Sequence, residues 1–274
     1  MSVLYVMGTP IGNLGDFSPR AVETLEKCDF IAAEDTRVTV KLLNHFGIKK
    51  NMVSYHEHNK REHGEQIIER LKSGESCVLV TDAGMPAISD PGEDLVRHCH
   101  ENGIKVESVP GPCAFSTALA ISGMPSGRFT FEGFLSMNKP GRREHLNSLK
   151  NETRTMLFYE APHKLGATLK DMNRAFGNRE IAIVREITKI HEEVIRTTLD
   201  EAVQLYGDNS LKGEIVLVIK GAEPEQAKET TLEEAVEIAK KSVENGMSVS
   251  EAAKETAKLY GFKKGDIYKQ LIGE

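Results

Sequence analysis

The segment CVLVTDAGMPAISDPG, residues 77–92, joins a candidate buried strand to a loop of small and polar residues. Residues 77–80 form a short apolar run typical of a strand covered on both faces, and residues 81–84 end that run abruptly. In an open α/β sheet, ligands bind just beyond the carboxyl ends of the strands, where loops expose backbone amides. The loop therefore predicts either a ligand site, in which Asp82 binds hydroxyls or a cationic group, or two turns before a helix that begins near Glu93.

Further buried strands are expected at residues 2–7, 30–33 and 104–109, and each runs into a loop of small or polar residues. The loop GTPIGNLGD, residues 8–16, matches neither the dinucleotide-binding fingerprint nor the P-loop. Helices expected between the strands predict a mostly parallel sheet. Because the carboxyl ends of parallel strands share one edge, the sequence predicts that these loops converge on a single cavity.

The composition is that of an ordinary globular protein of 274 residues with a formal net charge of -6. This charge argues against binding nucleic acid through the whole surface, so a polyanion would need a local basic patch. We expect residues 136–143, SMNKPGRR, to form a flexible basic loop that contacts phosphates. The alternative is a solvated loop followed by an amphipathic helix. The candidate contacts are Lys139, Arg142, Arg143 and Lys164.

The four cysteines lie far apart without CxxC spacing, which indicates reduced thiols. The chain begins without the features of a signal peptide, and no apolar run approaches the ~18 residues of a membrane span, so we expect a cytoplasmic protein. The pair His56 and His58 lies in a charged stretch without a third fixed ligand, and we expect no metal site.

Five strings in order carry a resemblance to a known family: GTPIGNLGD, TDAGMPAISDPG, VPGPCAFSTAL, FYEAPHKL and GEIVLVIKG. The chain resembles the tetrapyrrole methylases. Within that family GTPIGN, AEDTR, DAGMPAISDPG and FEGF followed by GRR resemble the branch whose members methylate a ribose 2'-hydroxyl of bacterial small-subunit ribosomal RNA. The resemblance covers residues 1 to about 222.

The resemblance implies two α/β domains, at residues 1–115 and 116–222, with S-adenosylmethionine bound in the cleft between them. Residues 223–274 are expected to form a polar linker and a small helical module whose spacing resembles a helix-turn-helix. A plain three-helix packing module explains the same spacing. The resemblance also implies a homodimer.

The cofactor contacts that the resemblance implies come from both halves of the chain. The first half supplies a loop after each of three strands, and the second half supplies residues at the ends of three more. They are Pro10, Asp82, Ala83, Gly84, Cys113, Ala114, Ser116 and Thr117, together with Tyr159, Glu160, Glu186, Ile187, Glu214 and Ile215.

Methyl transfer to a ribose hydroxyl needs a proton acceptor, because the hydroxyl is a poor nucleophile near neutral pH. Positioning and exclusion of water supply most of the remaining acceleration. Polar groups at strand ends give the candidate acceptors Asp35, Glu160 and His56, in that order of preference, and Arg37 is expected to orient the acceptor or a phosphate.

The predicted activity is methylation of a cytidine ribose 2'-hydroxyl in small-subunit (16S) ribosomal RNA, with the free RNA or the assembled subunit as partner. Two alternatives belong to other classes. A small-molecule, tetrapyrrole-type methyltransferase would share the fold without needing the basic loop, and a non-catalytic ribosome-assembly protein would keep the basic patch without binding the cofactor.

Overall fold

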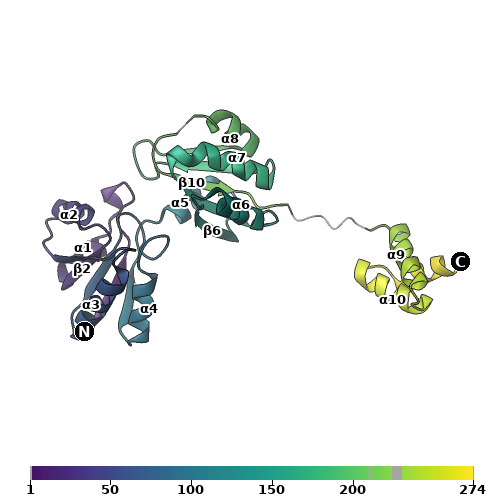
Figure 1. The fold of residues 1–274 in the computed structure, drawn as a ribbon, viewed down its shortest axis with the longest axis horizontal. Coiled ribbons are helices and arrows are strands. Elements are labelled where there is room, and N and C mark those ends of the chain that lie inside the picture. Colours follow the sequence, from purple (N-terminus) through teal and green to yellow (C-terminus); the bar gives the residue numbers. More distant parts are fainter. Residues whose placement is uncertain (1, 210, 224–229, 274) are drawn as a thin grey trace. The chain divides into compact units, whose positions relative to one another are not determined.

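The structure of the chain, a computed structural model, describes residues 2–209, 211–223 and 230–273. The chain divides into two compact units, residues 1–222 and 223–274. The first unit contains two five-stranded sheets with helices on both of their faces (Figure 1). The linker expected at residues 221–231 lies mostly at 224–229, outside the described residues.

The first sheet is entirely parallel, with strand order β3-β2-β4-β1-β5. All five strands are short and end at one edge, as the sequence predicts. The central strands β1, β2 and β4 are mostly buried, whereas the edge strands β3 and β5 are partly exposed. The strands are β1 (Val3–Met7), β2 (Phe30–Ala33), β3 (Asn51–Ser54), β4 (Cys77–Val80) and β5 (Lys105–Val109).

Two pairs of helices cover the first sheet. On one face, α1 (Pro19–Lys27) and α2 (Thr36–His45) pack against alternate strand residues such as Ile31 and Val78. On the other face, α3 (Lys60–Lys72) and α4 (Glu93–Glu101) pack against the intervening residues, such as Ala32 and Leu79. This alternation follows from the two-residue period of a strand, and α4 begins at Glu93, where the sequence predicts it.

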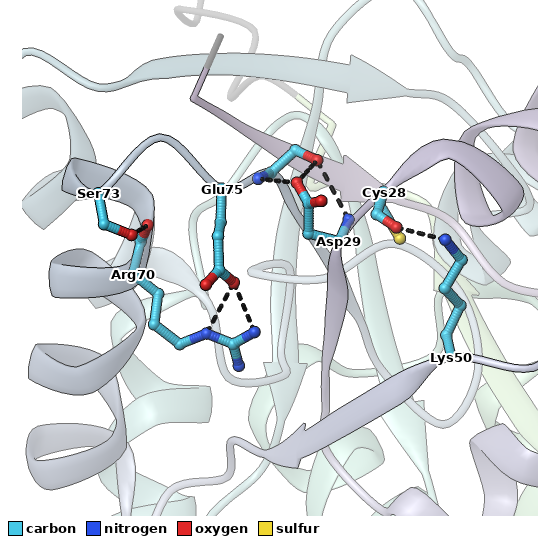
Figure 2. Close-up of polar contacts among 7 residues, drawn as sticks. Cys28, Asp29, Lys50, Arg70, Ser73 and Glu75 are labelled. Carbon is cyan, nitrogen blue, oxygen red and sulfur yellow. Dashed lines mark hydrogen bonds and ion pairs between the residues drawn. The ribbon is translucent and has the colours of Figure 1, made fainter.

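Polar contacts join the strands at the amino edge of this sheet, opposite the carboxyl edge at which the ligand-site loops lie (Figure 2). Asp29, directly before β2, accepts hydrogen bonds from the backbone and hydroxyl of Ser76, directly before β4, both at 2.7 Å. Lys50, directly before β3, donates to the carbonyl oxygen of Cys28 at 2.5 Å. These contacts join the starts of β2, β3 and β4. The loops at the carboxyl edge take no part in them.

The second sheet has the strand order β6-β7-β10-β8-β9 and is mixed, because only β6 and β7 run parallel. The antiparallel pairing brings Glu160, at the end of β7, opposite Ile215, at the start of β10. The strands are β6 (Phe129–Phe134), β7 (Thr155–Glu160), β8 (Glu180–Arg185), β9 (Glu193–Thr198) and β10 (Ile215–Ile219).

Helices also cover both faces of the second sheet. One face packs against α6 (Lys139–Ser148), α7 (Leu165–Phe176) and α8 (Leu199–Tyr206), and the other packs against α5 (Ala114–Ser122) and Ile11. The expected domain boundary at residue 115 therefore falls in the first turn of α5, whose buried face belongs to the second sheet.

The expectation of a flexible loop over residues 136–143 is wrong for its second half. Helix α6 begins at Lys139, with Pro140 in its first turn, where the missing N–H of proline is not needed. Leu146 and Arg142 are buried on the face that meets α7. The helix forms because this buried face stabilises it, despite the glycine and proline in its sequence.

The second unit is a three-helix module of α9 (Leu232–Glu244), α10 (Val249–Tyr260) and α11 (Lys264–Ile272). Thr231 and Glu234 form a reciprocal capping box at the start of α9. Alanines on α9 and α10 pack closely around Ile267. The described part of the chain contains no helix that is long and apolar enough to span a bilayer.

Candidate functional site

A cavity of about 380 Å³ lies where the carboxyl edge of the first sheet meets the second sheet. This volume is within the range of small-molecule sites, about 300–1,000 Å³. Among the expected cofactor contacts, four from the first half and five from the second line it: Ala83, Gly84, Cys113 and Ala114, and Tyr159, Glu160, Ile187, Glu214 and Ile215.

On the first-sheet side of the cavity, the backbones of the loops after β1, β4 and β5 lie in close contact. Thr9 and Gly84 exchange two backbone hydrogen bonds, of 2.9 and 3.1 Å, which join the loops after β1 and β4. A Cβ on Gly111 would lie 2.8 Å from the carbonyl oxygen of Gly8, closer than real Cβ contacts come. The loops after β1 and β5 can therefore touch only because both residues are glycine.

The loop after β4 is held in strained conformations where it borders the cavity. Ala87 has φ 67° and Ser89 has φ 138°, both unusual for residues with a Cβ, and Gly84 has φ 89°. Such conformations persist only where the surroundings enforce them, and they cluster at binding sites. Two turns do precede α4, but this loop also forms a wall of the cavity, so both interpretations of the sequence apply to it.

Two aromatic side chains, Tyr159 and Phe134, contribute to the second-sheet side of the cavity. The Tyr159 hydroxyl accepts a hydrogen bond from the backbone N–H of Phe115 at 3.2 Å, which ties β7 to α5. Burial raises the pKa of Tyr159 to about 12, so the hydroxyl stays protonated. Phe134, whose ring centroid is 5.4 Å from that of Tyr159, lines the cavity while 60% exposed.

Three carboxylates line the cavity, those of Asp90, Glu160 and Glu214, and their environments differ. Glu214 is exposed and pairs with Lys189 at 3.3 Å. Glu160 is buried and bonded through both oxygens, by the backbone N–H of Ala161 at 2.8 Å and the hydroxyl of Thr168 at 2.5 Å. Asp90 is half-buried and makes no hydrogen bond within the described part of the chain. Burial, and to a lesser degree Asp82, raises the pKa of Asp90 above its usual value.

The acidic residues that follow β2 lie beside this cavity, outside its lining. Asp35 caps α2 and accepts a bidentate hydrogen bond from Arg37, which lowers the pKa of Asp35 to about 2. Its backbone N–H donates to the Asp82 carboxylate at 3.2 Å, and the backbone N–H of Asp82 donates to Glu34 at 3.3 Å. Burial raises the pKa of both Glu34 and Asp82.

Other expected site residues also lie outside the cavity lining. Pro10 and Asp82 line a neighbouring hollow with residues of α2. The hydroxyls of Ser116 and Thr117 donate hydrogen bonds to the carbonyl oxygen of Cys113, at 3.1 and 2.9 Å.

Two more of the expected residues have local structural contacts. Glu186, at φ 51°, accepts from the Glu214 backbone N–H and from Lys189, each at 3.0 Å. His56 donates its backbone N–H to Asn59 at 2.8 Å, and its buried Nδ1 has no partner among the described residues.

Of the four basic residues expected to contact RNA, Lys139 and Arg143 are exposed on α6, and Lys164 is half-buried just before α7. Arg142 differs from the expectation. Its side chain is only 10% exposed and pairs with Asp171 on α7 at 2.5 Å, so it is not available to a phosphate in this conformation.

Sequence reasoning missed several residues of the cavity. Asp90 and Ser89 lie in the segment 77–92, where the sequence indicates only a turn at Asp90 and gives no role to Ser89. Phe134 ends strand β6, and no feature of the sequence indicates that its exposed ring borders the cavity. Within the described ranges, no group of three or more His, Cys, Asp or Glu side chains is arranged to hold a metal ion.

Comparison with known proteins assigns the fold and the family. The model of the tetrapyrrole (corrin/porphyrin) methylases matches residues 3–203. The chain belongs to this family. The ribosomal RNA small subunit methyltransferase I of Synechocystis sp. is 44% identical over 269 residues, which cover 98% of this chain and 96% of that protein. The protein of the same name from Thermotoga maritima is 46% identical over 223 residues, which cover 81% of this chain and all of that protein.

A solved structure of diphthine synthase superposes with a TM-score of 0.60 at 16% identity, covering 80% of this chain and 89% of that one, and so supports the fold alone. Members of the tetrapyrrole methylase family use S-adenosylmethionine as methyl donor.

Three observations indicate that the cavity of this tetrapyrrole methylase fits a methyl donor that contains a nucleoside. Ala83, Gly84 and Ala114 leave space for a flat group to approach the backbone. Gly84 has φ 89°, where a residue with a Cβ would be strained, so the wall depends on glycine there. The carboxylates of Asp90 and Glu160 offer negative charge toward a cationic ligand.

Proposed function

We propose that this tetrapyrrole methylase transfers a methyl group from S-adenosylmethionine to the ribose 2'-hydroxyl of a cytidine in small-subunit ribosomal RNA. The observation that carries the proposal is the single cavity lined by loops from both halves of the chain, in a sequence 44% identical over nearly its full length to a ribosomal RNA small subunit methyltransferase I. The Thermotoga maritima relative matches over 223 residues, close to the length of the first unit, which suggests that residues 1–222 carry the chemistry.

The donor is proposed to lie against Ala83, Gly84, Cys113 and Ala114 on one side and Tyr159, Ile187 and Ile215 on the other. When bound, S-adenosylmethionine supplies an electrophilic methyl group on a positively charged sulfur. The protein aligns the hydroxyl with this methyl group and excludes water, because an in-line displacement depends mainly on positioning. Pro10, Asp82, Ser116, Thr117, Glu186 and Glu214 are proposed to support these contacts from the loops around the cavity.

Among the candidate proton acceptors, we favour Asp90. Asp35 is a weak base, because its pKa of about 2 is set by the bond to Arg37. Both oxygens of Glu160 already accept hydrogen bonds, and His56 does not line the cavity. Asp90 has a raised pKa and no hydrogen-bond partner among the described residues, so its carboxylate is the stronger and more accessible base.

Arg37 is proposed to orient the acceptor nucleotide through its phosphate. Its side chain is 87% exposed, and Asp35 fixes its orientation by the bidentate contact. Lys139, Arg143 and Lys164 are proposed as further phosphate contacts, and Arg142 is left out because it is buried. Free RNA and the assembled small subunit are both proposed substrates.

Incubation of the chain with labelled S-adenosylmethionine and small-subunit RNA, followed by mass spectrometry of the nucleosides, tests the reaction. The expected product is a cytidine that carries the label on its ribose. Label on a base, or on a tetrapyrrole substrate offered in parallel, would contradict the proposal. Calorimetry with S-adenosylmethionine provides a second test, because a non-catalytic RNA-binding protein would not bind it.

We further propose a cytoplasmic location and a homodimer, of which the homodimer rests on the family resemblance. Light scattering on the purified chain gives its mass in solution. A monomer at micromolar concentration would contradict this proposal and leave the proposed reaction intact.

A further inference from the structure

A second hollow, of about 340 Å³, lies between helices α6 and α7 and shares no lining residue with the cavity. Residues of α6 line one side of it and residues of α7 line the other. Its lining is Arg143, Leu146, Asn147, Asp171, Arg174 and Ala175.

Three arginines converge on one carboxylate at this hollow. Asp171 is 9% exposed, and its Oδ2 accepts a hydrogen bond from Nε of Arg142 at 2.8 Å and forms an ion pair with Nη2 of Arg142 at 2.5 Å. Its Oδ1 accepts from Nη1 of Arg174 at 3.2 Å and lies 4.0 Å from Nε of Arg143. One negative charge among three positive charges leaves this site with an excess of two positive charges on a protein whose net charge is -6.

The three arginines have different roles. Arg142 is buried, and its hydrogen bond and ion pair neutralise the Asp171 carboxylate. Arg143 and Arg174 are 58% and 67% exposed, and Arg143 makes no hydrogen bond within the described ranges. A guanidinium carries five N–H donors in a fork that fits phosphate oxygens, so both side chains keep donors for a ligand. Asn147 adds an amide to the same wall.

We infer that this hollow binds a backbone phosphate of the RNA, held between Arg143 and Arg174. Asp171 and Arg142 are positioning residues: Asp171 accepts a hydrogen bond from Arg174 and lies 4.0 Å from Arg143, and Arg142 holds the Asp171 carboxylate in place. The identity of the polyanion rests on the proposed function. The geometry of the site itself is independent of the donor cavity.

The test is RNA binding by the full chain and by the double variant R143Q/R174Q over a salt series. Each phosphate contact contributes about 0.7 to the slope of log affinity against log salt for single-stranded RNA, so the variant should lose about 1.4 from the slope. If the two affinities converge at about 1 M salt, the variant binds roughly 25-fold more weakly at about 0.1 M salt.

The matched control is K27Q/K105Q, which removes the same charge from exposed lysines of the first half. It should keep the slope of the natural chain. Equal slopes for both double variants would show that overall charge, and not this hollow, governs the affinity, and would overturn the inference. Thermal unfolding of each variant checks that it remains folded.

The remaining outcomes separate this inference from the proposed function. If the natural chain methylates the RNA and R143Q/R174Q keeps its affinity and slope, the phosphate subsite is wrong and the function stands. If the natural chain binds no small-subunit RNA, the RNA assignment fails for both. Titration with inorganic phosphate shows whether the hollow binds a free phosphate instead of an RNA phosphate. Saturable phosphate binding that is lost in R143Q/R174Q, while the RNA affinity of this variant is unchanged, would indicate a free phosphate and overturn the inference.

Discussion

Replacing Arg142 by methionine should destabilise the first unit, because it leaves the Asp171 carboxylate buried without its main partner. Methionine keeps much of the aliphatic stem that packs between α6 and α7, so the change removes mainly charge and hydrogen bonds. Breaking a buried ion pair by removing one partner costs about 3–5 kcal/mol. Arg174 at 3.2 Å and Arg143 at 4.0 Å still face the carboxylate, which places the expected loss near the lower end, about 3 kcal/mol.

Urea unfolding followed by circular dichroism measures this loss, and a double-mutant cycle with D171N isolates the pair. Because D171N removes the buried charge that Arg142 neutralises, R142M/D171N should lose less stability than the sum of the two single variants. A loss below about 1 kcal/mol for R142M, the value typical of exposed ion pairs, would refute the reasoning. So would strict additivity in the cycle.

Three further predictions concern the cavity and the dependence of stability on pH. Asp90→Asn should lower turnover by about 10²–10⁴-fold and remove the acidic limb of the pH–rate profile, and an unchanged profile would exclude Asp90 as the proton acceptor. Gly111→Ala should weaken donor binding measured by calorimetry, because its Cβ would collide with the backbone of Gly8, whereas the control Gly127→Ala meets nothing within 4 Å and should bind normally. Hydrogen bonds from the side chain and backbone N–H of Arg154 lower the pKa of Glu152 from 4.5 to about 2. The ionised Glu152 therefore stabilises the fold above pH 4.5, and this contribution is lost as the pH falls toward 2. Glu152→Gln should therefore flatten the acid limb of a plot of stability against pH, and an unaltered limb would contradict this assignment.

Much of the first half of the fold could be predicted from the sequence, because its central strands are apolar runs that end abruptly in polar or small residues. Residues 77–80 and 30–33 illustrate this, and both are fully buried strands of a parallel sheet. Strand β9 was not predicted, since EVIRTT is an edge strand that mixes charged and β-branched residues and is only partly buried. Helix α6 was expected in part as a loop, because its stability comes from burial of Arg142 and Leu146 against α7, which local propensity does not register.

The candidate site was predictable where small residues follow strands. Ala83, Gly84, Cys113 and Ala114 line the cavity together for this reason. Roles that depend on ionic partners were not predictable. The bond between Asp35 and Arg37 weakens the carboxylate as a base, and the rise in the pKa of Asp90 comes from burial that only the folded chain creates.

Cys113 lines the cavity and is half-buried, whereas Cys28, Cys77 and Cys99 are buried in the first sheet and its helices. Burial raises the pKa of Cys28 and Cys99 to about 11 and that of Cys77 well above its usual value, so these thiols form little reactive thiolate at neutral pH. The natural chain thus carries a built-in attachment point for a thiol-directed fluorophore in the wall of the cavity. Protection of that single sulfur from alkylation would report donor occupancy without any engineered substitution.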